Sequence, residues 1–248
     1  MMKKHQSVSE VWDHKWKDFN IEQYIKESFK SDPWTLNHKS IIDKYLRRIN
    51  KGGIFLEAGC GMGQWCFYAS IKYQIKSIGV DIAEKIINRL NLFLKDNNGL
   101  ISFTIDDLNN SILPDNYCDM FVSLGVIEHF ENSVPMMKTL HRLLKPEGVG
   151  IITVPNVYST HTFARPILKI LNKWDIGYEK SLSPNSLKKL SIKSGFKVVE
   201  YGILPYGEMF GFFLSSLPII GNLFREFSYF IEKRQNILGF VSFVVVKK

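Results

Sequence analysis

A glycine-rich loop that follows an acidic residue is the part of the sequence with the clearest chemical meaning. Glu57 precedes three glycines at alternate positions, Gly59, Gly61 and Gly63. Glycines let the backbone approach a ligand closely and adopt positive φ angles. The loop completes neither the dinucleotide fingerprint G-x-G-x-x-G nor the phosphate loop G-x-x-x-x-G-K-S/T. An acid at its start is a poor neighbour for a pyrophosphate and suits a ligand that brings an ammonium or sulfonium group there.

Short apolar runs that alternate with longer amphipathic segments must position this loop. The predicted strands of this region are residues 54–58, 77–80, 100–105, 119–124 and 149–154. The predicted helices between them are residues 64–73, 83–95 and 135–144. This alternation favours right-handed βαβ units and a parallel sheet covered by helices on both faces. The loop would then lie at the carboxyl ends of the strands, where open α/β sheets bind their ligands.

Two further regions flank this core. Apolar side chains recur at helical spacing in the first 50 residues and predict a helical cap. Ser183, Pro184 and Gly195 are typical of the start and end of a helix, and two more strands are predicted after it. These last elements are a helix at 184–194 and strands at 196–204 and 238–246. We predict one domain over 1–248, divided into a cap at 1–50, a cofactor-binding core at 51–155 and an acceptor-side half at 156–248 with insertions at 156–182 and 205–236.

Charge is distributed unevenly along the chain. The 248 residues contain 32 Lys+Arg and 24 Asp+Glu, a formal net charge of +8. Residues 1–150 hold 19 basic and 18 acidic residues, whereas residues 151–248 hold 13 and 6. The basic residues of the second part are mixed with phenylalanine and proline and form no basic stripe. This favours an anionic, partly apolar acceptor or a membrane surface over a nucleic acid.

The cysteines and the N-terminal residues bear on the compartment. Cys60, Cys66 and Cys118 show no CxxC or Cys/His spacing, so we expect neither a disulfide framework nor a metal site. Residues 1–19 carry charges throughout and lack the apolar segment of a secretory signal. The uncharged run 209–224 is shorter than the ~20 residues of a spanning helix and contains proline and glycine. We therefore expect a cytoplasmic location.

Several groups of residues in a fixed order carry a resemblance to a known family. They are the loop at 57–63, Val80-Asp81 after the second predicted strand, and the run LGVIEH at 124–129 after the fourth. LPDNYCD at 113–119 and LLKPEG at 143–148, with Glu147 in place of a glycine, are similar to two further runs of that family. Together these residues resemble the class I S-adenosylmethionine-dependent methyltransferases. Closest are the small-molecule enzymes of the ubiquinone/menaquinone-biosynthesis type (methyltransferase type 11/23), over residues 52–154 and more loosely to the end.

The resemblance implies a Rossmann-like α/β fold, a seven-stranded, mostly parallel sheet with helices on both faces, and S-adenosyl-L-methionine as the cofactor. S-adenosyl-L-homocysteine would be its product. The glycines would lie against the methionine and ribose parts of the cofactor, and Glu57 would face its ammonium group. Asp81 would accept both ribose hydroxyls, although an N-cap of the next helix is its alternative role. Asp106 or Asp107 would bind the adenine amino group, and we prefer Asp106 because it follows the strand directly. The implied cofactor-binding set is Glu57, Gly59, Gly61, Gly63, Asp81, Ile82, Asp106, Asp107, Leu108, Leu124 and Gly125.

Methyl transfer from a sulfonium requires mainly proximity and alignment, and a base only where the acceptor must lose a proton. His129, in the loop after the fourth predicted strand, is the preferred candidate for this catalytic role, with shaping of the pocket as its alternative. His161, Tyr158 and Tyr178 are further candidates. We expect a methyltransferase that acts on a small-molecule, lipid or glycan-type acceptor, with oxygen preferred over nitrogen and carbon.

The sequence leaves several other functions open. Methyltransferases that act on bases place Asn/Asp-Pro-Pro-Tyr after the fourth strand, whereas this chain has residues SLGV at 123–126. A protein or nucleic-acid methyltransferase, an NAD-dependent oxidoreductase and a non-catalytic protein of the same fold are the alternatives. The segment 205–236 is rich in phenylalanine, glycine and proline. It predicts either a lid over the acceptor or a peripheral contact with a membrane.

Overall fold

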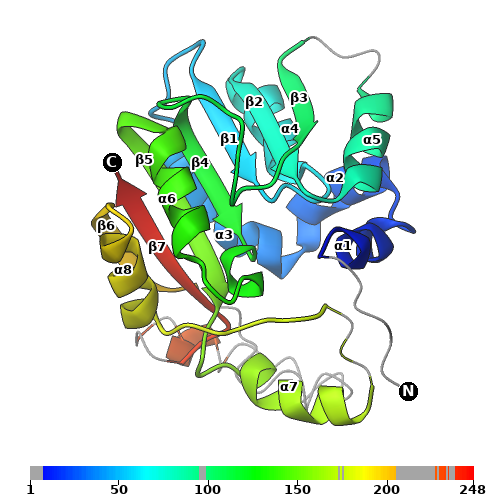
Figure 1. Ribbon diagram of the computed structural model, residues 1–248, viewed down its shortest axis with the longest axis vertical. Helices are drawn as coiled ribbons and strands as arrows, with labels where there is room; N and C mark the ends of the chain where they lie inside the picture. Colours follow the sequence, from blue (N-terminus) through cyan, green and yellow to red (C-terminus); the bar gives the residue numbers. More distant parts are fainter. Residues whose placement is uncertain are drawn as a thin grey trace.

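A seven-stranded sheet forms the centre of the molecule (Figure 1). The computed structural model describes residues 8–94, 99–172, 174, 176–204, 227, 229–232, 234 and 238–248. The strands are β1 (Ile54–Ala58), β2 (Lys76–Asp81), β3 (Ile101–Ile105), β4 (Cys118–Leu124), β5 (Leu144–Pro155), β6 (Lys197–Leu204) and β7 (Val241–Lys247). Their order in the sheet is β3-β2-β1-β4-β5-β7-β6. Strand β7 is antiparallel to β5 and β6, and the other neighbouring pairs are parallel, which confirms the predicted fold class.

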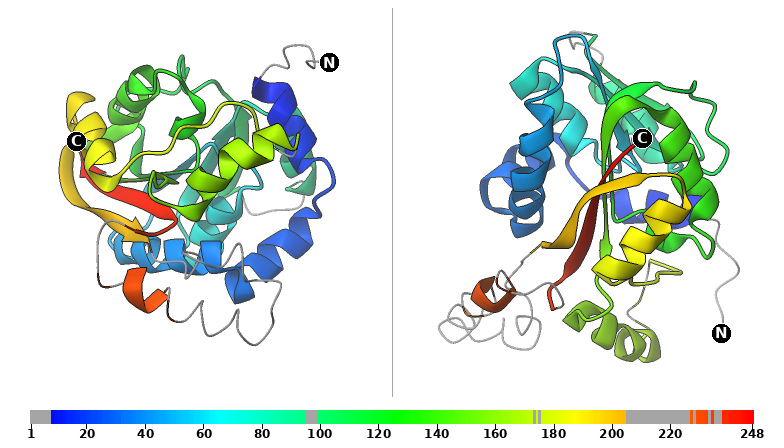
Figure 2. Two further views of the ribbon diagram at one scale, coloured as in Figure 1. Left: turned by 90° about the horizontal axis from the view of Figure 1, so that it is seen from below. Right: turned by 90° about the vertical axis from the view of Figure 1, so that its left-hand side faces the viewer.

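Helices cover both faces of the sheet (Figure 2). On one face lie α3 (Pro33–Leu46), α4 (Gln64–Tyr73) and α5 (Glu84–Phe93), and on the other lie α6 (Val134–Leu143) and α8 (Pro184–Lys193). Successive strand residues point to opposite faces. Phe55 accordingly belongs to the core under the first group of helices, and Leu56 to the core under the second. Both side chains are fully buried, so the continuous apolar runs of the central strands are explained by burial on two sides.

The strand order places a ligand site between β1 and β4. Strand β1 pairs with β2 on one side and with β4 on the other. The chain passes from β1 to β2 and β3 on the first side, and then crosses to β4 on the second side. The connections from these two strands therefore diverge at their carboxyl ends. Such a topological switch point is where open α/β sheets bind ligands, and the loop that begins after Ala58 lies there.

Three helices precede the sheet, as the helical spacing of the first 50 residues predicted. They are α1 (Val8–Trp16), α2 (Ile21–Ser31) and α3. Helix α1 packs against α5 beside the carboxyl end of β2. Asp13 accepts a hydrogen bond from the backbone N–H of Lys85 at 2.9 Å, and Arg89 donates to the carbonyl oxygens of Trp16, Lys17 and Phe19. These bonds anchor the second half of α1 and the residues that follow it.

The second half of the chain differs in part from its prediction. The segment 156–182, for which no helix was predicted, contains α7 (Thr160–Ile170), which begins after the N-cap Ser159 and continues through Pro166. Strand β7 begins at Val241, three residues later than predicted. The greater part of the insertion 205–236 lies outside the described residues. Within the part of the chain that the structure describes, no helix has the length and hydropathy needed to cross a membrane.

Candidate cofactor and acceptor site

The glycine loop is held against the end of β2 by its own backbone. The N–H groups of Gly59 and Cys60 both donate to the carbonyl oxygen of Val80, at 2.8 and 2.9 Å. Gly61 has a positive φ of 47°, and a Cβ there would lie 2.9 Å from the ring of Trp16. A side chain at this position would therefore strain the backbone and displace α1, which explains the glycine.

Asp81 joins the loop to the end of β2. Its Oδ2 accepts from the N–H of Gly61 at 2.8 Å and its Oδ1 from the N–H of Ala83 at 2.9 Å. Each carboxylate oxygen can accept more than one hydrogen bond, so both keep capacity for a ligand hydroxyl. Burial raises the pKa of Asp81, against the lowering effect of these backbone donors. The N-cap of α5 is Ala83, so the alternative role of Asp81 as the N-cap of this helix was wrong. Asp81 lines a cavity, and its ribose-binding role stays a prediction.

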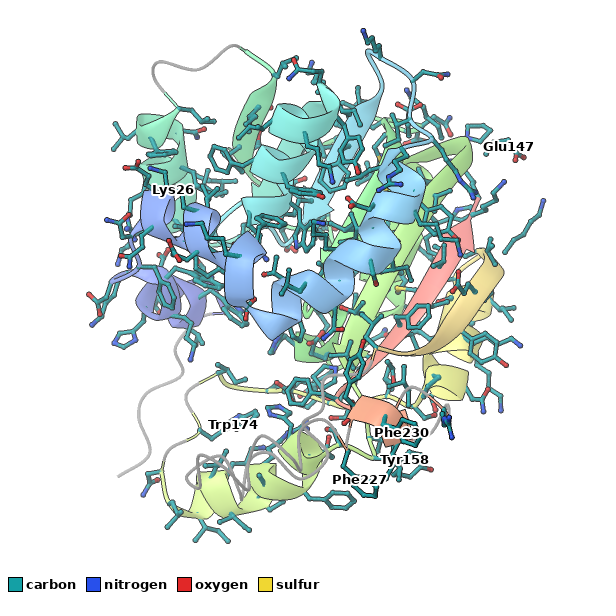
Figure 3. The ribbon with its side chains drawn as sticks, turned by 180° about the vertical axis from the view of Figure 1, so that it is seen from behind. Lys26, Glu147, Tyr158, Trp174, Phe227 and Phe230 are labelled. Carbon is teal, nitrogen blue, oxygen red and sulfur yellow. The ribbon has the colours of Figure 1, made fainter. Side chains whose placement is uncertain are left out.

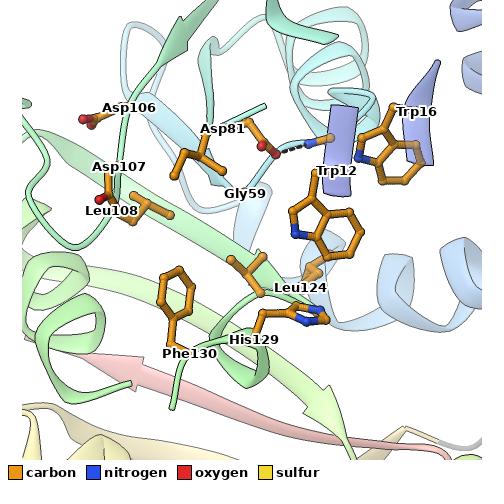
Figure 4. A pocket seen from close by; sticks show the side chains of 14 residues that line it. Trp12, Trp16, Gly59, Asp81, Asp106, Asp107, Leu108, Leu124, His129 and Phe130 are labelled. Carbon is orange, nitrogen blue, oxygen red and sulfur yellow. Dashed lines mark hydrogen bonds between the residues drawn. The ribbon is translucent and has the colours of Figure 1, made fainter. Parts of the chain in front are cut away.

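The cavity beside Asp81 has a volume of about 630 Å³, which includes space open to solvent. Figure 4 shows Trp12 opposite His129 on one side of it, and Leu108 and Phe130 on another. Nine of the eleven predicted cofactor-binding residues line it: Gly59, Gly61, Asp81, Ile82, Asp106, Asp107, Leu108, Leu124 and Gly125. The sequence therefore identified most of this wall, although these positions are far apart in the chain.

Glu57 and Gly63 are the two predicted residues outside this lining. Gly63 is the N-cap of α4 with a φ of 68°, and a Cβ there would lie 2.5 Å from the ring of Phe103. Close packing against Phe103 therefore accounts for this glycine. Glu57 is buried and accepts from the N–H of Cys66 at 2.9 Å. Burial raises the pKa of Glu57 to about 8.

The two acids after β3 are both at the cavity, but they have different partners. Asp106 is buried and accepts from the hydroxyl of Ser111 and from the N–H of Ile112. Asp107 accepts from the N–H of Asn109 at 2.9 Å. The backbone N–H of Asp106 donates to the carbonyl of Asp81 at 3.1 Å, which ties the ends of β2 and β3 together. The choice between Asp106 and Asp107 stays a prediction.

A second cavity, with an open volume of about 1080 Å³, adjoins the first and shares part of its wall. The residues that line both cavities are Trp12, Trp16, Gly59, Gly61, Leu124, Gly125 and His129. Beyond them the second cavity is lined mainly by residues of the N-terminal cap and of the glycine-loop region, such as Trp34 and Trp65. From the second part of the chain it is lined by Pro155, His161 of α7, Ile176, Glu179 and Phe240. It thus begins beside the cofactor-side cleft and extends into the acceptor-side half of the chain.

His129 lies where the two cavities meet. Its Nδ1 is 2.8 Å from the carbonyl oxygen of Tyr178, and its ring packs edge-on against Trp12 at a centroid distance of 4.9 Å. A carbonyl oxygen can only accept, so Nδ1 carries a proton and Nε2 of the neutral ring keeps a free lone pair. Burial lowers the pKa of His129, which favours that neutral form. The geometry suits a proton acceptor at this junction.

The other candidate bases are placed differently. His161 lines the second cavity, but its Nε2 is 2.8 Å from Oε1 of Glu179, which also receives Arg165. The side chains of Tyr158 and Tyr178 are exposed, and neither residue lines the two cavities. Among the histidines and tyrosines considered, His129 therefore has the best placement.

The wall of the second cavity contains two buried polar atoms without a hydrogen-bond partner within the described residues. They are Oε2 of Glu128 and Nε1 of Trp65. Nε1 of Trp65 can donate to a carboxylate, and Glu57 on the same wall can accept from an ammonium group. The methionine part of S-adenosylmethionine carries both groups and therefore fits these two residues, which leaves Oε2 of Glu128 for another ligand.

Sequence reasoning missed Glu128 and the aromatic residues of the N-terminal cap. Glu128 stands within the quoted run LGVIEH, yet no role was assigned to it. Trp12 and Trp16 were recognised only as apolar positions of a helix. Their spacing of four residues put them on one face, but the sequence contained no signal that this face would cover the glycine loop.

The fold and a family model indicate the same class of protein. Residues 56–152 match the family model described as "Methyltransferase domain". Residues 56–152 thus carry a methyltransferase domain, within the α/β fold of class I S-adenosylmethionine-dependent methyltransferases, and S-adenosylmethionine is the cofactor of this class.

Relatives of two kinds are similar to the chain. The phosphoethanolamine N-methyltransferase of Plasmodium falciparum is 32% identical over 107 residues, which cover 42% of this chain and 40% of that protein. The chain thus spans less than half of that relative. The ubiquinone biosynthesis O-methyltransferase of Rickettsia bellii is 25% identical over 97% of both chains. Two solved structures of Haemonchus contortus phosphoethanolamine N-methyltransferase 2 are similar to the chain. The complex with phosphomonomethylethanolamine and S-adenosylhomocysteine has a TM-score of 0.70, and the complex with S-adenosylmethionine has a TM-score of 0.67. In its phosphomonomethylethanolamine complex it is 16% identical and covers 100% of this chain and 61% of that one.

Proposed function

We propose that the protein transfers the methyl group of S-adenosylmethionine to a small-molecule acceptor bound in the second cavity. The observation that carries the proposal is the junction of the two cavities at Leu124, Gly125 and His129. A donor bound against Asp81 and the glycine loop has its reactive end at this junction, next to the space for an acceptor. Alignment of the two reactants is the main catalytic requirement of this reaction.

Equilibrium binding and methyl transfer test the proposal together. Titration calorimetry should detect binding of S-adenosylmethionine and S-adenosylhomocysteine, and no binding of NAD. Labelled donor incubated with cell extract should then label the small-molecule or lipid fraction. NAD binding without donor binding, or label confined to protein, RNA or DNA, would contradict the assignment.

We also propose that the end of the molecule around α7 makes a peripheral membrane contact. Figure 3 shows Tyr158, Phe227 and Phe230 at this end. Phe163, Ile167 and Ile170 recur at helical spacing on α7 and are 68%, 54% and 80% exposed. An exposed apolar stripe on an amphipathic helix is typical of helices that lie in a membrane interface. The excess of basic over acidic residues in 151–248 favours anionic lipids.

Vesicle sedimentation tests this contact. The protein should sediment with phosphatidylglycerol-containing vesicles, and Ile170→Glu should remove most of that binding. Leu92→Glu, on α5 and 59% exposed, is the matched control and should bind as the unchanged protein does. Equal binding of both variants would exclude α7 as the contact.

A further inference from the structure

The second cavity combines aromatic walls with acidic groups. Among the described residues, six tryptophan, tyrosine and phenylalanine side chains line it: Trp12, Trp16, Tyr24, Trp34, Trp65 and Phe240. Its described charged lining consists of Glu57, Glu128 and Glu179 against a single lysine, Lys15. The basic excess of the second half of the sequence is therefore not found on this wall. An anionic acceptor, which that excess favoured, gains no support from the described lining.

The three acids of the wall differ in how their charge is compensated. Glu179 pairs with Arg165 at 2.6 Å and with His161 at 2.8 Å. Glu57 receives the N–H of Cys66. Glu128 is only 2% exposed, and its Oε2 has no partner among the described residues. A buried carboxyl group without a partner is costly, so a site of this kind is completed by a ligand that brings a donor or a positive charge.

The charge of the wall discriminates between acceptor classes. A phenol or hydroxyl acceptor becomes negative as it loses its proton, and nearby carboxylates in a low-dielectric site disfavour that charge. An amine enters as a cation, which the same carboxylates attract and which aromatic faces stabilise further. Burial raises the pKa of Glu128 in the ligand-free protein, and a bound cation would oppose that rise. The wall therefore favours nitrogen over oxygen.

We propose that the second cavity binds its acceptor as a small organic ammonium ion and that Glu128 contacts the nitrogen and accepts its proton. This inference rests on the proposed methyl transfer. The ammonium N–H bond breaks and its proton passes to the Glu128 carboxylate. The freed lone pair of the nitrogen forms the new N–C bond with the methyl group. The C–S bond breaks with its electron pair retained by sulfur, which becomes a neutral thioether.

Binding of a cation that cannot be methylated tests the site without turnover. With saturating S-adenosylhomocysteine, choline should bind at least tenfold more tightly than its neutral isostere 3,3-dimethylbutan-1-ol in an NMR titration. Glu128→Gln should weaken choline binding at least tenfold and leave the affinity for S-adenosylhomocysteine within twofold, which also shows that the variant is folded. Glu131→Gln, an exposed position three residues away, is the matched control and should change neither affinity.

Two results would overturn the inference. One is absence of choline binding at millimolar concentration, or equal binding of choline and the isostere. The other is a Glu128→Gln variant that loses mainly S-adenosylhomocysteine affinity, which would assign Glu128 to the cofactor. Methyl transfer to catechol but not to N,N-dimethylethanolamine would overturn the amine acceptor and leave the proposed methyl transfer standing. Failure to bind S-adenosylmethionine would instead reject the proposed function itself.

Discussion

At the scale of single residues, Asp81 holds two parts of the cofactor-side cleft together through one carboxylate. Its carboxylate organises the glycine loop through Gly61 and the start of α5 through Ala83. In the predicted role it also accepts two ribose hydroxyls. Asparagine has almost the same shape, but its amide nitrogen can only donate, so one of these backbone N–H groups or one hydroxyl would lose its acceptor.

Asp81→Asn should therefore weaken S-adenosylhomocysteine binding by roughly 10-fold to 100-fold, because a hydrogen bond to a charged group is worth about 1.5–3 kcal/mol. Titration calorimetry measures the change. Asp18→Asn, at a side chain 85% exposed, should bind normally. An Asp81→Asn protein that binds as tightly as the unchanged one would refute the ribose role.

The site residues that could be predicted from the sequence were predictable for one physical reason. Asp81 and Asp106 each follow an apolar run, and the carboxyl ends of parallel strands meet at one edge of a sheet. Strand periodicity alone therefore brings such residues to one cleft. Trp12 and Glu128 could not be assigned in this way. The position of Trp12 depends on how α1 packs across the molecule, and the unpaired state of Glu128 becomes visible only when all of its neighbours are known.

At the scale of elements, α1 covers the cleft, and one side chain holds its end. Arg89 of α5 donates to the carbonyl oxygens of Trp16 and Lys17 at 2.7 and 3.1 Å, and to that of Phe19. Carbonyls at a helix C-terminus have no partner within the helix, so a guanidinium group there satisfies them. Arg89 thus couples the position of α1 to the rigid sheet below.

Arg89→Met should loosen α1 and speed the release of S-adenosylhomocysteine several-fold, because the residues that line the cleft on this side lie on α1. Stopped-flow fluorescence follows the release, and hydrogen exchange should show weaker protection confined to α1. Arg47→Met, on an exposed side chain at the end of α3, provides the control. Unchanged release in the Arg89 variant would mean that α1 is held without this contact.

At the scale of the whole molecule, the buried acids make stability depend on pH. Burial raises the pKa of Glu57 from its ordinary value of 4.5 to about 8. The folded protein therefore binds this proton more tightly than the unfolded chain. Stability rises with pH only where the unfolded state binds more protons, so Glu57 acts in the opposite direction. Its contribution is complete below about pH 4.5 and is lost as the pH rises to about 8.

The melting temperature of the ligand-free protein should consequently fall between pH 5 and pH 8, and Glu57→Gln should flatten the fall. Differential scanning calorimetry at several pH values measures both curves. S-adenosylmethionine should raise the melting temperature more at pH 8 than at pH 5, because its ammonium group favours the ionised carboxylate. A parallel fall in the Glu57→Gln protein would assign the pH dependence to other groups.

Trp12 and Trp16 belong to the walls of both cavities, so the two ligands share one boundary. Any shift of α1 that tightens one cavity changes the shape of the other, and the two binding free energies are then linked. The linkage is reciprocal: whatever the acceptor does to the affinity for the donor, the donor does equally to the affinity for the acceptor. Because α1 borders both cavities, its movement controls the release of both products, and the way it moves sets the order in which they leave.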